Sequence, residues 1–206
     1  TECCARSIAR LPNRHWCSCA EMIRHVLCLM RSCEVRLLLL TVLLMVNAAS
    51  RSADTDVPSA YQAVAEAYGI PAALFYAIAL TETGRKVSST DGFRPWPWSA
   101  NFNGEGHFFS SRRAALQAIE TYLADGQRSV DIGLMQVSWR YHAATLGTVW
   151  KALDPYFNLT IAAAILVDCQ QRLDDWWASV GCYHAPRDPA RAAKYRSRVR
   201  RHWQSL

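Results

Sequence analysis

The segment from Ile70 to Gly84 constrains the fold of this chain more than any other part of it. After Pro71 its apolar side chains recur at the spacing of an α-helix, and a glycine such as Gly84 is typical of a helix end. The segment therefore predicts a buried helix whose last turn carries the one charged side chain of the run, Glu82.

Glu82 is a candidate proton donor. Burial disfavours the ionised form of a carboxyl group and raises its pKa. A carboxylic acid that stays protonated near neutral pH can give its proton to a glycosidic oxygen, and sites that cleave sugars place such a group in an apolar pocket. The segment alone leaves two interpretations open: sugar-cleaving chemistry, or a glutamate that merely caps the helix end in solvent.

The first 49 residues differ in character from the rest. Their cysteines show no metal-ligand pattern such as repeated CxxC pairs. From Met30 onward, basic residues precede an apolar run over 37–46 and the small residues Ala48 and Ala49, which is the order of an export signal. We interpret 1–49 as leader and signal peptide, cleaved after Ala48 or Ala49, and 50–206 as one periplasmic domain. An uncleaved membrane anchor is the alternative.

The exported part is mildly basic. Of the 23 Lys and Arg and the 17 Asp and Glu residues, six and three precede residue 49, which leaves 17 minus 14, or +3. Much of the excess lies near the C-terminus, at Arg187, Arg191, Lys194, Arg196, Arg198, Arg200 and Arg201. We expect a solvated helix face there and no nucleic-acid partner; contact with a polyanion or an anionic membrane is the alternative.

Cys169 and Cys182 are the two cysteines that remain after the leader. An even number of cysteines in an exported chain favours a disulfide, and two buried free thiols are the alternative. No Gly-rich phosphate loop and no zinc-ligand spacing appears in the sequence, and its histidines are scattered. We therefore expect no cofactor and no metal.

Further patterns predict a mainly α-helical domain with one small β-hairpin. Apolar stripes and capping residues predict helices over about 58–68, 111–124, 156–173, 176–183 and 189–203. Between them, Asn103-Gly104 is the pair favoured in a tight hairpin turn, with Phe102 on one arm and Phe108 and Phe109 on the other. We expect these phenylalanines to pair across the hairpin.

Two further segments combine residue types that suit a sugar. In the run over 131–139, Met135 offers an adaptable apolar wall and Gln136 an amide that both donates and accepts hydrogen bonds. In the run over 178–186, Tyr183 stands at a helix end, where its hydroxyl can orient a carboxyl group. Each segment alone is equally typical of an ordinary loop or core.

The three segments, in the order Glu-Thr-Gly, Gly-Leu-Met-Gln and Tyr-His-Ala, together resemble the SLT-type lytic transglycosylases, relatives of goose-type lysozyme that cut bacterial peptidoglycan. The resemblance covers about 57–203 and includes the helix over 158–166. The Trp96-Pro97-Trp98 insertion resembles the branch carried by conjugative and integrating elements. These aromatic residues either pack on the domain, stack on sugar rings or dock a secretion-machine partner.

The resemblance implies a lysozyme-like fold and assigns roles to single residues. Glu82 is the catalytic acid and base, and the residues that contact the glycan or support the glutamate are Thr83, Met135, Gln136, Tyr183 and His184. Two positions depart from the family pattern, since Ser138 and His184 stand where asparagines are usual. We expect Asp131, the one nearby carboxylate, to order the loop or cap a helix.

The expected function is cleavage of the β-1,4 bond between N-acetylmuramic acid and N-acetylglucosamine without water, which leaves a 1,6-anhydro product on glycan strands of peptidoglycan. A muramidase that admits water is the competing enzyme. The non-enzymatic alternative is a glycan-binding module of a conjugative or type IV secretion apparatus.

Overall fold

The computed structural model describes residues 57–86 and 92–206, so the predicted leader and signal lie outside the described residues. Within these ranges the chain is mainly helical, which confirms the predicted fold class. The helices are α3 (Ser59–Ala67), α4 (Ala72–Thr83), α5 (Arg112–Ala124), α6 (Trp139–Leu146), α7 (Val149–Ala152), α8 (Pro155–Leu173), α9 (Trp176–His184) and α10 (Pro189–Trp203). The strands are β1 (Gly84–Lys86), β2 (Phe93–Pro95), β3 (Ser99–Phe102), β4 (Glu105–Phe108), β5 (Val130–Ile132) and β6 (Val137–Ser138).

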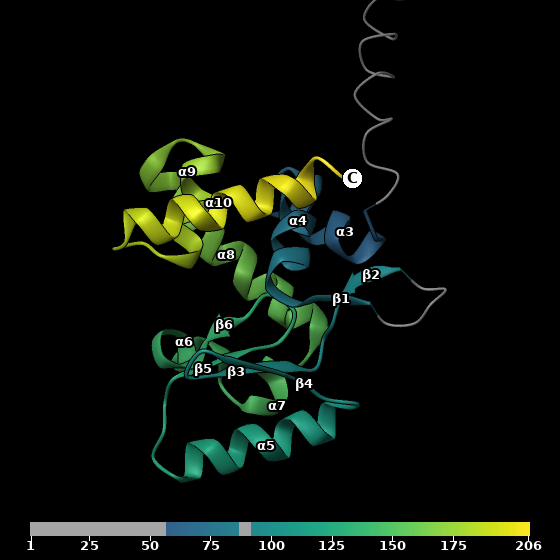
Figure 1. Ribbon diagram of the computed structural model, residues 1–206, viewed down its shortest axis with the longest axis vertical. Coiled ribbons are helices and arrows are strands. Elements are labelled where there is room, and N and C mark those ends of the chain that lie inside the picture. The colour runs from purple at the N-terminus through teal and green to yellow at the C-terminus, as the bar shows by residue number, and fades with distance from the viewer. Residues whose placement is uncertain (1–56, 87–91) are drawn as a thin grey trace, which may run out of the picture. The chain divides into compact units, whose positions relative to one another are not determined.

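Helix α4 lies at the centre of the helical half. Nine of its twelve residues are buried, among them Phe75 and Ile78 with no exposed surface. A helix that is apolar all round has no solvent face, so it must be covered on every side. Helices α3 and α10 pack against it, and Figure 1 shows α3, α4, α9 and α10 grouped at one end of the domain.

The helices begin where the sequence predicts them to begin. Ser111, Asp154, Asp175 and Asp188 each cap a helix, their side chains accepting a hydrogen bond from the backbone N–H three residues on. The two short helices α6 and α7 were not predicted. The apolar pattern of α6 is weak, since Leu146 is its one buried residue, and α7 has only four residues, too few to show a period.

The predicted hairpin is confirmed and belongs to a larger sheet. Strands β3 and β4 are joined at Asn103 and Gly104, both with positive φ, as a two-residue turn of the primed type requires. The four-stranded antiparallel sheet has the order β4-β3-β5-β6, and β1 pairs with β2 separately. The expected pairing of Phe102 with Phe108 or Phe109 is wrong, because Phe102 lies opposite Glu105 and its ring contacts Tyr122 at 4.8 Å.

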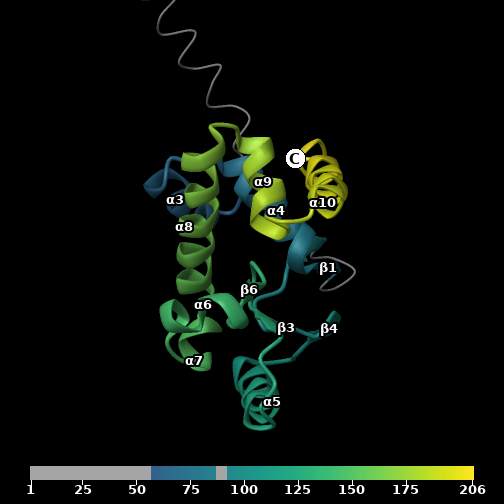
Figure 2. The same ribbon diagram turned by 90° about the vertical axis from the view of Figure 1, so that its left-hand side faces the viewer.

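Helix α8 joins the helical half to the sheet half. It contacts α3 and α9 in one and α7 and β6 in the other, as the two perpendicular views show (Figures 1 and 2). The predicted disulfide is confirmed: Cys169 of α8 is bonded to Cys182 of α9. It ties together two helices that border the candidate site described below.

Among the residues described, no single helix is long and apolar enough to span a membrane. Helices α3 and α4 meet that criterion only as a pair, and they are bent by 119° at the break between them. The apolar run over 37–46, on which the alternative of a membrane anchor depends, lies outside the described residues.

Candidate active site

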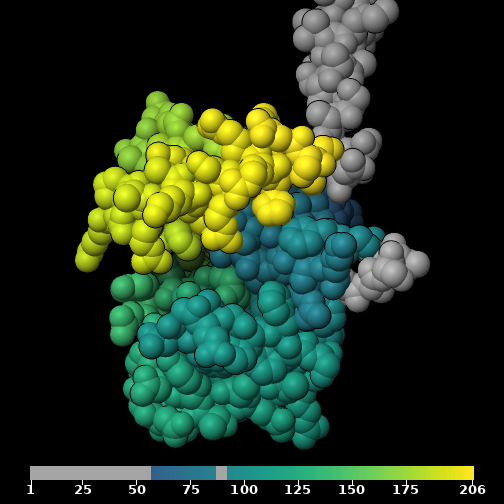
Figure 3. All heavy atoms as spheres, viewed as in Figure 1, coloured from purple at the N-terminus to yellow at the C-terminus, as the bar shows by residue number. Residues whose placement is uncertain are grey.

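A cleft of about 970 Å³ separates the helical half from the sheet half. Figure 3 shows the recess below α10. The end of α4 enters the cleft with Glu82, strand β5 contributes Asp131, and the α9–α10 region contributes Tyr183 and His184. This volume lies at the upper end of the range of small-molecule pockets and suits an extended ligand.

Glu82 lies in this cleft with 13 % of its side chain exposed. The hydroxyl of Tyr195, on α10, donates a hydrogen bond of 2.6 Å to its Oε1. Arg198, one turn further along α10, donates to the carbonyl oxygen of Thr81 at 3.1 Å. The carboxyl group is thus held at the cleft wall by a neighbouring helix rather than exposed as a helix cap.

Burial raises the pKa of Glu82 from 4.5 to about 7. A low-dielectric environment disfavours the charged form of the carboxyl group. The hydrogen bond from Tyr195 and the charge of Arg198 lower the pKa of Glu82, and the nearby Asp131 carboxylate raises it. Burial is the largest of these effects, and the pKa is therefore raised. Near neutral pH the group is therefore available both as an acid and as a base.

His184 approaches Glu82 without neutralising it. Its Nδ1 lies 3.9 Å from Glu82 Oε1, beyond hydrogen-bonding distance, and its ring stacks on Tyr195 at 4.2 Å between centroids. Burial, followed by the charges of Arg191 and Arg198, lowers the pKa of His184 below 6.5. At neutral pH the imidazole is therefore predominantly neutral, and it forms no ion pair that would stabilise the ionised form of Glu82.

Asn158 of α8 holds the loop over 133–136, whose Gln136 lines the same cleft as Glu82. It is fully buried, accepts a hydrogen bond from the Met135 backbone N–H at 2.9 Å, and donates to the carbonyl oxygens of Ile132 and Ala152 at 2.9 and 3.1 Å. Gly133 has a φ of +81°, and a Cβ there would lie 2.6 Å from Asn158 Nδ2. The glycine is required both by its conformation and by this close approach.

Residues 59–205 match the family described as Transglycosylase SLT domain. The chain belongs to this family. Comparison with curated proteins and with solved structures gives no match. Members of the SLT family are lytic transglycosylases, and their substrate is peptidoglycan. The match confirms the resemblance to SLT-type enzymes.

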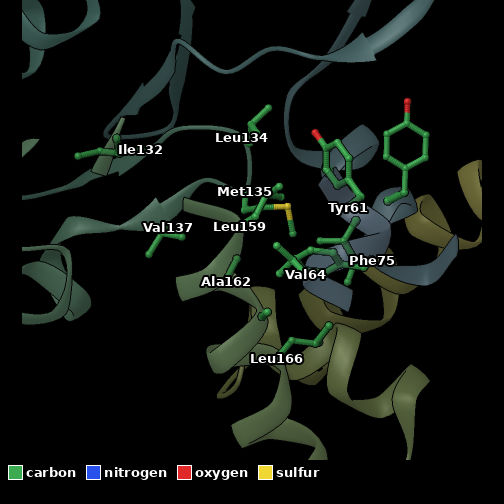
Figure 4. Packing of buried hydrophobic residues seen from close by; sticks show 14 of the residues in the cluster. Tyr61, Val64, Phe75, Ile132, Leu134, Met135, Val137, Leu159, Ala162 and Leu166 are labelled. Carbon is green, nitrogen blue, oxygen red and sulfur yellow. The ribbon is translucent and has the colours of Figure 1, made fainter. Parts of the chain in front are cut away.

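Two residues that the resemblance assigns to the glycan are buried. Thr83 is 1 % exposed and its hydroxyl donates to the carbonyl oxygen of Leu134 at 2.7 Å. Met135 has no exposed surface, and Figure 4 shows its side chain among Val64 and Leu159. The expectation that both contact the glycan is therefore wrong for their side chains in this structure, and both instead join the loop over 133–136 to the core.

Gln136 and Tyr183 do line the cleft. Gln136 has a φ of +49°, and its amide donates to the carbonyl oxygen of Gly133 at 2.9 Å. The hydroxyl of Tyr183 donates to the carbonyl oxygen of Met135 at 2.7 Å. The prediction that the Tyr183 hydroxyl orients the glutamate is thus wrong, because Tyr195 supplies that hydrogen bond.

Asp131 and Ser138 face each other across the sheet at the floor of the cleft. A hydrogen bond from Ser138 lowers the pKa of Asp131, but burial prevails and raises it. Asp131 lies within β5 and caps no helix, so the expected capping role is wrong. Asp168 and Asp188 also line the cleft, but Asp131 is the carboxyl group whose charge acts on the pKa of Glu82.

The aromatic insertion packs on the domain. Trp98 and Phe102 contact the hydrophobic core, and the indole N–H of Trp96 donates to the carbonyl oxygen of Phe109 at 2.7 Å. None of the three lines the cleft. In residues 57–86 and 92–206, no group of three or more His, Cys, Asp or Glu side chains is placed to hold a metal ion.

Proposed function

We propose that the chain is an exported lytic transglycosylase that cleaves the β-1,4 bond between N-acetylmuramic acid and N-acetylglucosamine and forms a 1,6-anhydromuramyl product. The observation that carries this proposal is Glu82: a buried carboxyl group in the cleft, with a pKa of about 7, in a chain of the SLT family. One group with this pKa can act as acid and base in turn.

In the first step the protonated Glu82 gives its proton to the departing glycosidic oxygen, and the C1–O bond breaks. The acetamido group of the substrate stabilises the positive charge that develops at C1. In the second step the Glu82 carboxylate takes the proton of the muramyl C6 hydroxyl, whose oxygen bonds to C1 and closes the anhydro ring. Glu82 ends the turnover protonated again, and no water is consumed.

Tyr195 and Arg198 support the ionised intermediate state of Glu82. The Tyr195 hydroxyl donates to the carboxylate, and the positive charge of Arg198 lies nearby. Both favour the charged form, whereas burial favours the neutral one. These opposing effects bring the pKa near the operating pH, where a group that must both give and take a proton is most effective.

Digestion of purified sacculi tests the proposed reaction. The protein should release soluble muropeptides whose masses are those of anhydro sugars, each lighter by one water than the corresponding reducing sugar. Products with reducing ends would identify a muramidase instead. Glycan binding without any product over long incubation would identify a non-catalytic module.

The hydrolytic muramidase is the second candidate, and Asp131 is the observation that favours it. Glycoside hydrolysis uses a pair of carboxyl groups that flank the bond, and Asp131 lines the same cleft as Glu82. An Asp131→Asn variant separates the two: it should retain anhydro product formation if Glu82 acts alone. Loss of all turnover in a folded variant would assign Asp131 to the chemistry.

The rate of cleavage should fall as the pH rises through about 7. Glu82 gives its proton only when protonated, and its pKa in the free protein is about 7. The profile of kcat/KM against pH reports this ionisation. An alkaline limb centred near 4.5, the ordinary pKa of a glutamate, would contradict the assignment.

The variants Tyr195→Phe and Tyr183→Phe distinguish the two tyrosines of the cleft. Tyr195→Phe removes the hydrogen bond that lowers the pKa of Glu82, so the alkaline limb should move to higher pH, by about one unit for each 1.36 kcal/mol that the hydrogen bond contributes. Tyr183→Phe removes the hydroxyl that donates to the Met135 carbonyl oxygen and should lower the free energy of unfolding by about 1–2 kcal/mol. The alkaline limb of its pH profile should not move. The reverse pattern would return the supporting role to Tyr183.

We also propose that residues 1–49 direct export to the periplasm and are removed there, leaving 50–206 as the enzyme. The order of basic, apolar and small residues over 31–49 supports this proposal. The Trp96-Pro97-Trp98 insertion supports an association with a conjugative or type IV secretion apparatus, as its resemblance implies. Fractionation of cells that express the full chain, with mass analysis of its N-terminus, tests the export.

A further inference from the structure

One face of α10 presents two arginines on either side of the tyrosine that holds Glu82. Arg191, Tyr195 and Arg198 are spaced at i, i+4 and i+7, which places them on the same side of a helix. Arg187 lies just before α10, and all three arginines line the cleft. We call Arg187, Arg191 and Arg198 the arginine stripe.

The stripe reaches the catalytic end of the cleft. The charges of Arg191 and Arg198 both lower the pKa of His184, whose Nδ1 lies 3.9 Å from Glu82 Oε1. Arg198 is already occupied, since it donates to the Thr81 carbonyl oxygen at 3.1 Å. Arg187 and Arg191 line the same cleft, and no hydrogen bond of their side chains to another described residue occupies them.

Arg187 and Arg191 are exposed, and neither has a carboxylate oxygen within 4.0 Å among the residues that the structure describes. Asp188 lies between them in sequence and also lines the cleft, but its carboxylate accepts the backbone N–H of Arg191 as the cap of α10. Two guanidinium groups without an acidic partner thus point to a ligand with carboxylates of its own.

We propose that Arg187 and Arg191 bind carboxylates of the stem peptide that peptidoglycan carries on its muramic acid. The inference rests on the proposed function and names the part of the substrate that these arginines recognise. The N-acetylated sugar rings are neutral once the lactyl group is joined to the peptide, whereas the stem presents several free carboxylates. The protein therefore prefers glycan with stem peptides to bare glycan.

Two forms of one glycan test this inference. Peptide-bearing strands are compared with the same strands after an N-acetylmuramyl-L-alanine amidase has removed the stems. Binding is measured in the Glu82→Gln background, so that no turnover intervenes, and cleavage is measured with Glu82 intact. The peptide-bearing form should bind more tightly, and the preference should shrink at high salt because exposed charges are screened.

The double variant Arg187→Gln/Arg191→Gln should reduce the preference about threefold to tenfold, in keeping with the modest strength of exposed ion pairs. Arg201→Gln is the matched control: it makes the same change on α10, and Arg201 does not line the cleft. It should retain the full preference. Thermal unfolding of each variant confirms that it is folded.

Equal affinity for the two glycans, a preference that survives in the double variant, or an equal loss in Arg201→Gln would overturn the inference. Its failure is distinct from failure of the proposed function. If neither glycan is cleaved, the lytic reaction is wrong, and the ratio of the two dissociation constants still decides whether the arginines recognise the stem.

Discussion

Replacing Glu82 by Gln should lower the rate of peptidoglycan cleavage by a factor on the order of 10² to 10⁴, the usual contribution of general acid–base catalysis. Glutamine keeps the shape of the side chain and an oxygen that can accept the hydrogen bond from Tyr195, but it has no proton to give. The measurement is kcat on sacculi near neutral pH. Turnover close to that of the unmodified protein would show that Glu82 is not the acid.

The stability of the same variant is its control. Because the pKa of Glu82 is about 7 in the folded protein and 4.5 as the ordinary value, folding takes up a proton between these pH values. Stability is therefore lost as the pH rises through this window, by roughly 3 kcal/mol in total at 1.36 kcal/mol per pH unit. Glu82→Gln should be more stable than the unmodified protein by about this amount above pH 7, and not below pH 4.5.

Replacing Asn158 by Ala should lower the free energy of unfolding by at least about 3 kcal/mol. Three buried backbone groups lose their partner, namely the Met135 N–H and the Ile132 and Ala152 carbonyl oxygens. Each buried group left without a hydrogen bond costs about 1–3 kcal/mol. Denaturant unfolding measures the loss, and cleavage should fall as well because the loop before Gln136 is released.

Thr160→Ala is the control for Asn158 on the same helix. The Thr160 hydroxyl donates to the carbonyl oxygen of Tyr156 at the surface, so its loss should change stability by less than about 1 kcal/mol. If Asn158→Ala costs no more than this control, the amide does not hold the loop.

Local patterns were sufficient to predict most helices and the acid. Apolar periodicity predicts helices α8 to α10, and the Asn103-Gly104 pair predicts the turn between β3 and β4. The short strands β5 and β6 were missed because two or three residues carry no period of their own. Strand β5 forms because β3, about 30 residues earlier in sequence, offers it a partner, and β6 then pairs with β5.

The surroundings of the acid depend on tertiary contacts that the sequence does not contain. Tyr195 is 113 residues from Glu82 in sequence. It lies in a basic helix whose residue pattern predicts a solvent-exposed face. Tyr183 belongs to the recognisable motif, so the sequence favours it over Tyr195 as the partner of Glu82. Thr83 and Met135 neighbour the cleft in sequence, but only the fold determines that their side chains point away from it into the core.

The proposed catalytic mechanism depends on the ionisation of Glu82, which can be measured by NMR. The protein, labelled with ¹³C at glutamate carboxyl carbons, is titrated from pH 3 to 9, and the Glu82 signal is identified by its absence in Glu82→Gln. The midpoint of the Glu82 signal should lie near 7, well above the ordinary value of 4.5. A midpoint near 4.5 would contradict the mechanism, because such a carboxyl group has no proton left to give at neutral pH.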